Sequence, residues 1–136
     1  MKANTVLAWI CYALFFLFIY ASLNKLFAYD FYIYDLKRSP LLSSYAIPIA
    51  VLVPVMELLV AFLIIADSTR RYGLAGAVLL MAGFTIYVAY VLIFTAERPC
   101  TCGGLIRHLS WNQHLVFNIT FLFLAIVGYR LTYLLK

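Results

Sequence analysis

Residues 46–66 have the sequence AIPIAVLVPVMELLVAFLIIA, and this stretch decides the fold. It is apolar throughout except for Glu57, and its length matches the about 20 helical residues that cross a bilayer core. The connection that follows, DSTRRYG at residues 67–73, is short and polar, and a second long apolar stretch begins at Leu74. Because a backbone inside the membrane must satisfy its own hydrogen bonds, we expect the two stretches to form an antiparallel helical hairpin.

Four apolar stretches of this kind divide the chain. We place the membrane spans at Thr5–Phe27, Ala46–Ala66, Leu74–Ala96 and Leu115–Leu135. Of the 136 residues, 67% are hydrophobic and 11% are charged, a composition that excludes an ordinary soluble domain. We therefore predict an all-α integral membrane protein, an antiparallel four-helix transmembrane bundle that forms a single domain over residues 1–136. Both termini are expected on one side of the membrane.

The connections between the spans carry local structural signals. The first is aromatic and charged, ends at Ser39-Pro40, and is typical of a short helix lying in the membrane interface. In the third connection, Ser110-Trp-Asn-Gln113 matches the S-x-x-Q capping box, so the fourth helix is expected to begin there.

The positive charge of the chain is better explained by the membrane surface than by a nucleic-acid partner. The net charge is +5, and no basic patch stands apart from the apolar spans, which argues against a nucleic-acid partner. The positive-inside count is tied at five on each side, with Lys2, Arg70, Arg71, Arg130 and Lys136 against Lys25, Lys37, Arg38, Arg98 and Arg107. If Lys25 is a functional residue within the membrane, its charge is left out of this count. The termini then lean towards the cytoplasm, and the third connection lies outside.

The third connection contains the sequence PCTCGG at residues 99–104. A thiolate is the reactive form of cysteine, nearby cations favour it, and Arg98 and Arg107 flank the pair Cys100 and Cys102. A disulfide between cysteines separated by one residue would close a strained ring. Such a bond is better suited to thiol–disulfide exchange than to a structural cross-link. A redox pair is favoured over two ordinary loop thiols. Copper(I) binding is a minor alternative. No metal ligand set is assigned, because no second Cys/His pair with zinc spacing occurs.

The third cysteine, Cys11, lies within the first span towards the side of the termini. Much of the membrane separates it from Cys100, so we expect a small buried apolar residue rather than a disulfide partner.

Glu57 is the second strong signal, because an acid in the middle of a span is costly and usually faces the bundle interior with a partner. Ser22 and Lys25 share one face of the first span, and Lys25 is the candidate partner. Glu57 lies roughly 16 Å into its span at 1.5 Å per residue, whereas Lys25 is near the end of its own. Direct contact therefore needs a long lysine reach or a first span that lies deeper in the membrane, and snorkelling of Lys25 to the interface is the alternative.

His114 and Asn118 follow each other at i,i+4 spacing where the fourth span begins, on the cysteine side of the membrane. They could accept protons from thiol chemistry or bind a quinone carbonyl. Hydrogen bonding between helices is the alternative interpretation.

Taken together, these motifs resemble the MauE branch of the DoxX-like membrane proteins. The resemblance rests on Ser22-x-x-Lys25, Ser39-Pro40-Leu-Leu, Pro54-x-x-Glu57 and Cys100-x-Cys102-Gly-Gly, whose order and spacing cover nearly the whole chain. It implies a small redox-associated protein of the bacterial inner membrane, linked to methylamine utilisation and to maturation of an extracytoplasmic partner. The four-helix arrangement is also similar to the disulfide-generating DsbB and vitamin K epoxide reductase bundles. Those enzymes use Cys-x-x-Cys and a second cysteine pair, and this chain has neither.

Three functions remain open at this point. In the first, Cys100 and Cys102 exchange disulfides with a thiol-containing extracytoplasmic or membrane protein, supported by Glu57, Lys25 and His114. A quinone is then the cofactor class considered, with Ser22 and Asn118 as a speculative site, and no cofactor is certain. The second is a non-enzymatic assembly or export factor. The third is copper handling or transport along a polar path, for which a four-helix bundle would need to form a homo-oligomer.

Overall fold

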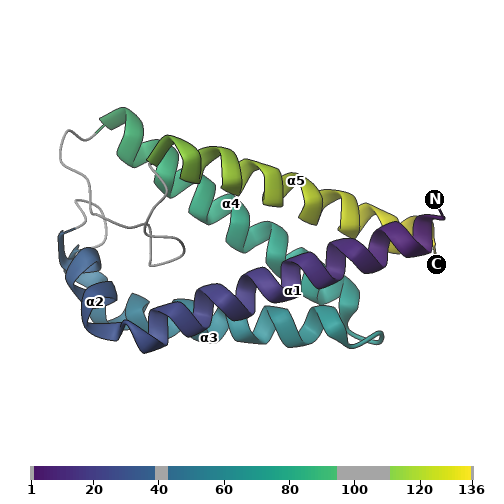
Figure 1. Cartoon of the computed structure of the whole chain (residues 1–136), viewed down its shortest axis with the longest axis horizontal. Coiled ribbons are helices and arrows are strands. Elements are labelled where there is room, and N and C mark those ends of the chain that lie inside the picture. Colours follow the sequence, from purple (N-terminus) through teal and green to yellow (C-terminus); the bar gives the residue numbers. More distant parts are fainter. Residues whose placement is uncertain (1, 39–42, 95–110, 136) are drawn as a thin grey trace.

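The computed structural model describes residues 2–38, 43–94 and 111–135 (Figure 1). Within them the chain forms α1 (Ala3–Phe27), α2 (Tyr29–Arg38), the 3-10 turn η1 (Ser43–Tyr45), α3 (Ala46–Ile65), α4 (Arg70–Phe94) and α5 (Trp111–Leu134), with no strand in the part described. By length and composition, α1, α3, α4 and α5 can each cross a membrane. The prediction of an all-α four-helix membrane bundle is confirmed, and α2 is the short helix expected in the first connection.

The helix boundaries differ a little from the expected spans. α1 begins at Ala3 rather than Thr5, and α4 begins at Arg70 rather than Leu74. Hydropathy locates the apolar part of a helix, whereas the helix itself continues into polar residues that satisfy its end. α5 begins at Trp111, directly after the expected cap residue Ser110, which lies outside the described residues.

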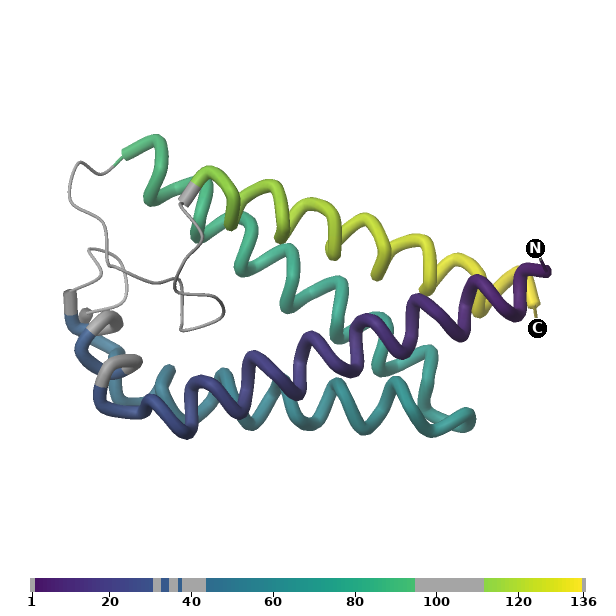
Figure 2. The backbone as a smooth tube through the Cα atoms, viewed as in Figure 1, coloured from purple at the N-terminus to yellow at the C-terminus, as the bar shows by residue number. Residues whose placement is uncertain are grey.

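The four long helices form two pairs. α1 packs along α3 and α4 packs along α5, while α3–α4 and α1–α5 contacts join the pairs. Both termini lie at one end of the bundle, as expected, and the pairs diverge towards the other end (Figure 2). Close approaches between the pairs occur in the half near the termini: a Cβ added to Gly128 of α5 would lie 2.9 Å from a methyl carbon of Ile10 on α1.

The turn between α3 and α4 is held by side chains that donate hydrogen bonds to the carbonyl groups at the end of α3. Thr69 Oγ1 donates to the Leu63 carbonyl at 2.9 Å, and Arg70 Nε donates to the Ile64 carbonyl at 3.0 Å. Arg70 also pairs with Asp67 at 2.8 Å. The last carbonyls of a helix have no partner within it, so these side chains end α3 and begin α4 together.

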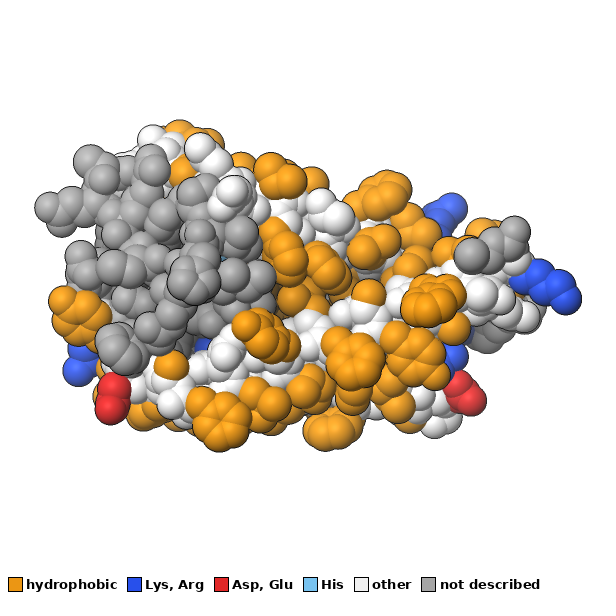
Figure 3. Space-filling model, viewed as in Figure 1, with side chains coloured by type: hydrophobic (Ala, Val, Ile, Leu, Met, Phe, Trp, Pro, Cys, Tyr) orange, Lys and Arg blue, Asp and Glu red, His pale blue; other side chains and the backbone are white. Residues whose placement is uncertain are grey.

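The apolar residues divide between a core and a lipid-facing surface. The core lies where the four helices meet and includes Leu14, Phe18, Ala61, Ile64 and Leu74. Large apolar side chains also cover the outside of the bundle, while the charged side chains visible on the face in Figure 3 lie mainly towards its two ends. An apolar belt between charged ends is the surface that a lipid bilayer requires.

Candidate functional site

The candidate site begins with two side chains on one face of α1. Ser22 and Lys25 are one helical turn apart. Both side chains face α3, which packs along α1. Ser22 Oγ donates to the carbonyl oxygen of Pro54 at 3.2 Å, and Lys25 Nζ lies 2.8 Å from Glu57 Oε1. The two motifs S-x-x-K and P-x-x-E, separate in the sequence, thus meet as one polar contact between α1 and α3.

The lysine reaches Glu57 although it lies near the end of its helix. A side chain on a helix tilts towards the helix N-terminus, and lysine has a long flexible stem. The ammonium of Lys25 therefore lies deeper in the bundle than its Cα atom. Lys25 is 4% exposed and Glu57 is fully buried, which rules out the alternative that Lys25 snorkels to the interface.

Pro54 shapes α3 next to this contact. Proline has no N–H, so Pro54 cannot donate the usual helical hydrogen bond to the carbonyl of Ala50 one turn earlier. Ser22 binds the carbonyl of Pro54 itself. A hydroxyl donor from α1 therefore reinforces α3 close to the helical position that proline weakens.

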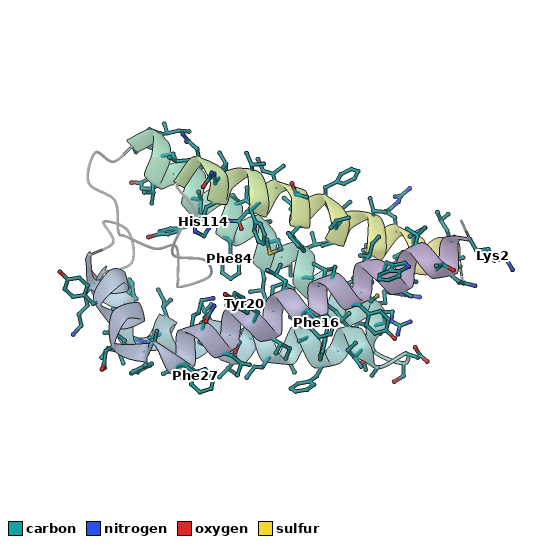
Figure 4. All side chains as sticks on the ribbon, viewed as in Figure 1. Lys2, Phe16, Tyr20, Phe27, Phe84 and His114 are labelled. Atoms are coloured by element: carbon teal, nitrogen blue, oxygen red, sulfur yellow. The ribbon has the colours of Figure 1, made fainter. Side chains whose placement is uncertain are left out.

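A third helix reaches the ion pair through an aromatic ring. The Lys25 ammonium lies 5.9 Å from the centroid of the Phe84 ring on α4, within the range of a cation–π contact. The contact links the α1–α3 pair to the α4–α5 pair in the half of the bundle where the pairs diverge. Figure 4 shows Phe84 pointing from α4 towards α1.

His114 and Asn118 occupy the buried face of α5 at its beginning. They are 2% and 3% exposed, so the expected i,i+4 pair lies inside the bundle and not on its lipid surface. Figure 4 shows the His114 side chain on the inward side of α5. The buried polar residues of the described chain therefore come from α1, α3 and α5: Ser22, Lys25, Glu57, His114 and Asn118.

Residues 3–131 match the family described as methylamine utilisation protein MauE. The chain belongs to the MauE family. The match includes all of α1 to α4 and most of α5, and so confirms the resemblance seen in the sequence. No curated protein and no solved structure matches the chain significantly.

The cysteines of this MauE-family chain fall into two groups. Cys100 and Cys102 lie in residues 95–110, outside the described part, so the interpretation of this pair stays a prediction. Cys11 is 2% exposed and packs in the core of α1, as expected for a small apolar residue. Cys11 therefore also provides a buried reference thiol within the same chain.

Two features of this buried site could not be predicted from the sequence. Phe84 is one of 11 phenylalanines, and nothing in its local sequence distinguishes it from those that face lipid. The second feature is the Glu57 carboxylate: Oε1 lies 2.8 Å from Lys25 Nζ, but neither oxygen makes a contact of full hydrogen-bond geometry within the described residues, although both are completely buried. A sequence can indicate a buried acid, but it does not show which oxygen the partner reaches.

Proposed function

We propose that this chain is an inner-membrane component of thiol–disulfide exchange that acts in the maturation of an extracytoplasmic partner protein. Its four spanning helices make it a multi-pass membrane protein, and its family suggests a role in methylamine utilisation. The proposal adds that residues 1–136 act as one domain and that the Cys100–Cys102 connection faces outward. Methylamine itself is not proposed as a ligand.

The observation that carries the proposal is the buried Lys25–Glu57 contact of 2.8 Å. A charged pair inside a membrane bundle is expensive and usually marks a functional centre. Lys25 lies in the last turn of α1, and the helix pairs diverge at that end of the bundle (Figure 2). α4 ends at Phe94 and α5 begins at Trp111 at that same end (Figure 1), which supports the proposal that the connection with Cys100 and Cys102 acts on the side of the ion pair.

The exchange reaction balances without a bound cofactor. A thiolate of the partner attacks the Cys100–Cys102 disulfide, forms a mixed disulfide and releases one cysteine of the pair as a thiolate. The second thiolate of the partner then breaks the mixed disulfide. The partner leaves with a disulfide, and the pair keeps two electrons and takes up two protons.

Returning the pair to the disulfide requires an acceptor of two electrons and two protons. A second thiol–disulfide protein or a quinone belongs to the right chemical class. His114 and Asn118 are the residues proposed to accept protons or a quinone carbonyl, with Ser22, Lys25 and Glu57 holding the helices around them. These roles agree with the burial of all five side chains in the described bundle.

Trapping with a membrane-impermeant maleimide mass tag in intact cells tests both the redox state and the orientation. We expect Cys100 and Cys102 to react from outside only after treatment with a reductant, while the buried Cys11 stays unlabelled. Substituting both loop cysteines by serine should leave partner thiols reduced. The proposal fails if both thiols are already reduced in growing cells and the serine variant behaves as wild type.

A non-enzymatic assembly factor is the second candidate, favoured by an exposed aromatic row along α1. Trp9, Tyr12, Phe16 and Tyr20 are all more than half exposed and follow one helix face. Aromatic side chains are enriched in binding surfaces as well as at membrane interfaces. Co-purification of a membrane partner that survives the Cys100→Ser/Cys102→Ser change and is lost on Phe16→Ala would favour this function over exchange.

A further inference from the structure

Two adjacent arginines at the start of α4 have different surroundings. Arg70 pairs with Asp67 at 2.8 Å and donates to the Ile64 carbonyl at 3.0 Å, so the turn between α3 and α4 uses its guanidinium. Arg71 has no acidic side chain within ion-pair distance among the described residues. Its guanidinium carbon instead lies 4.6 Å from the centroid of the Tyr133 ring on α5. Of the two arginines, Arg71 is the one whose charge the described chain leaves without an anion.

The Tyr133 ring holds the guanidinium of Arg71 at the surface of the bundle. A guanidinium stacks on an aromatic face, which attracts its charge but is not a conventional hydrogen-bond acceptor. The ring is itself held by α5, because the Tyr133 hydroxyl lies 3.1 Å from the Tyr129 hydroxyl one helical turn earlier. The N–H groups of a guanidinium form a planar fork that matches the oxygens of a phosphate. Arg71 therefore has an oriented fork whose donors are available to a ligand.

A second cation lies beside the same ring. Arg130 is exposed and comes three residues before Tyr133, so the two side chains are neighbours on the surface of α5. Within the part of the chain that the structure describes, Arg130 also has no acid at ion-pair distance. Arg71 of α4 and Arg130 of α5 are thus two cations next to one tyrosine.

The end of the bundle that holds the termini is positively charged. The charged side chains described at this end are Lys2, Arg70, Arg71, Arg130 and a single acid, Asp67, which Arg70 already pairs. Figure 3 shows Lys and Arg side chains projecting from this end. At the opposite end, the exposed charged side chains that the structure describes are Asp30 and Lys37, whose charges cancel. The unpaired positive charge of the described chain is therefore concentrated where the termini lie.

The position of these cations in the membrane indicates the class of anion. Arg71 is the second residue of α4 and Tyr133 the second to last of α5, and both helices are long and apolar enough to span a bilayer. The ends of such helices lie at the level of the lipid headgroups. The anion found throughout that layer is the phosphate of a phospholipid. A zwitterionic lipid carries its own cation beside the phosphate, whereas an anionic lipid leaves the negative charge for the protein.

We infer that Arg71, Arg130 and Tyr133 form a binding site for the phosphate of an anionic phospholipid. The Arg71 fork donates to the phosphate oxygens, the Tyr133 ring holds the guanidinium in that orientation, and Arg130 supplies the second positive charge. The site lies at the end of the bundle with the termini, whereas the proposed thiol chemistry belongs to the other end. The inference therefore does not depend on the proposed function.

Native mass spectrometry of the purified full chain in a neutral detergent tests the site. Phosphatidylglycerol and phosphatidylcholine with identical acyl chains are added separately, and the bound fractions give the two affinities. We expect phosphatidylglycerol to bind roughly 25-fold more tightly, with about fivefold from each arginine. Equal affinities overturn the inference. Inorganic phosphate at the same concentration should displace none of the lipid, and displacement would make the ligand a free anion and contradict a lipid site.

Matched substitutions locate the site. Arg71→Met and Arg130→Met should each reduce the preference for phosphatidylglycerol about fivefold. Tyr133→Leu should also reduce it, although no charge is removed, because the guanidinium loses its support. Lys37→Met removes one exposed positive charge from the other end and should leave the preference unchanged. If Lys37→Met lowers the preference as much as Arg71→Met, lipid selection follows net charge alone and the inference is wrong.

An acidic segment of a partner protein is the other class of anion for these cations. A decaglutamate peptide distinguishes it, since the peptide carries negative charge without a phosphate or an acyl chain. We expect the peptide to leave phosphatidylglycerol bound at equal concentration. Displacement of the lipid by the peptide from wild type, with weaker displacement from Arg71→Met, would assign this surface to a protein and contradict the inference.

Discussion

Lys25 and Glu57 form an ion pair of 2.8 Å that joins α1 to α3 inside the apolar bundle. The side chains are 5% and 0% exposed, so water does not screen the pair. Burial of two charges is offset only when each keeps the other as a partner. The contact therefore makes the loss of one partner more damaging than the loss of both.

Removal of Lys25 alone should destabilise the protein strongly. Lys25→Met leaves the Glu57 carboxylate buried without its cation, a change that costs about 3–5 kcal/mol in folded proteins. The double change Lys25→Met/Glu57→Met removes both charges and should recover most of that loss. Denaturant unfolding in detergent measures the two free energies.

Lys37 provides the control for this comparison, since it is an exposed lysine on α2. Lys37→Met should change the unfolding free energy by no more than about 0.5 kcal/mol. If Lys25→Met and Lys37→Met have equal effects, the ammonium of Lys25 is not held inside the bundle in the folded protein.

Ser22→Ala should have a small and specific effect. It removes the 3.2 Å hydrogen bond to the Pro54 carbonyl, and hydrogen bonds between membrane helices contribute about 0.6 kcal/mol on average. Thr120→Val is the comparison, because Thr120 bonds the Val116 carbonyl within its own helix and joins no helices. Unfolding measurements in which Thr120→Val costs more than Ser22→Ala would count against a linking role for Ser22.

The sequence predicted the helices well because hydropathy acts over whole spans. It also selected Ser22, Lys25, Glu57, His114 and Asn118, since polar residues in apolar helices are energetically conspicuous. All five are buried in the structure. Distance along the chain was less informative: it left open whether Lys25 reaches Glu57 or extends to the interface, because residue counting locates Cα atoms and ignores the direction in which a side chain extends.

The contacts that apolar residues make could not be predicted from the sequence. Phe84 carries no charge and looks like any lipid-facing phenylalanine, so its place over the Lys25 ammonium depends on how α4 is rotated in the bundle. The same applies to Gly73. Its sequence suggests a turn residue, whereas the structure places it in α4 against the backbone of α3.

Gly73→Ala should be clearly destabilising. An added Cβ would lie 2.5 Å from the Ile64 backbone nitrogen and 2.7 Å from the Leu63 carbonyl carbon, so the two helices must move apart. Overpacking of this kind costs about 1–3 kcal/mol. Gly83→Ala lies in the same helix with open space around it, and should instead stabilise by about 0.5–1 kcal/mol through helix propensity. Thermal unfolding of both variants checks the opposite signs, and equal effects would contradict the close α3–α4 approach.

Tyr133 should stabilise the end of the bundle near the termini through its ring. The Arg71 guanidinium carbon lies 4.6 Å from the ring centroid, and the Tyr133 hydroxyl lies 3.1 Å from that of Tyr129. Tyr133→Phe keeps the ring and loses the hydroxyl, whereas Tyr133→Leu loses both. We expect Tyr133→Leu to be less stable than Tyr133→Phe by about 0.5–1 kcal/mol, the contribution of an exposed cation–π contact. In an Arg71→Met background this difference should shrink, because the cation is absent. A difference that stays the same in that background would assign the effect to apolar packing of the ring and not to Arg71.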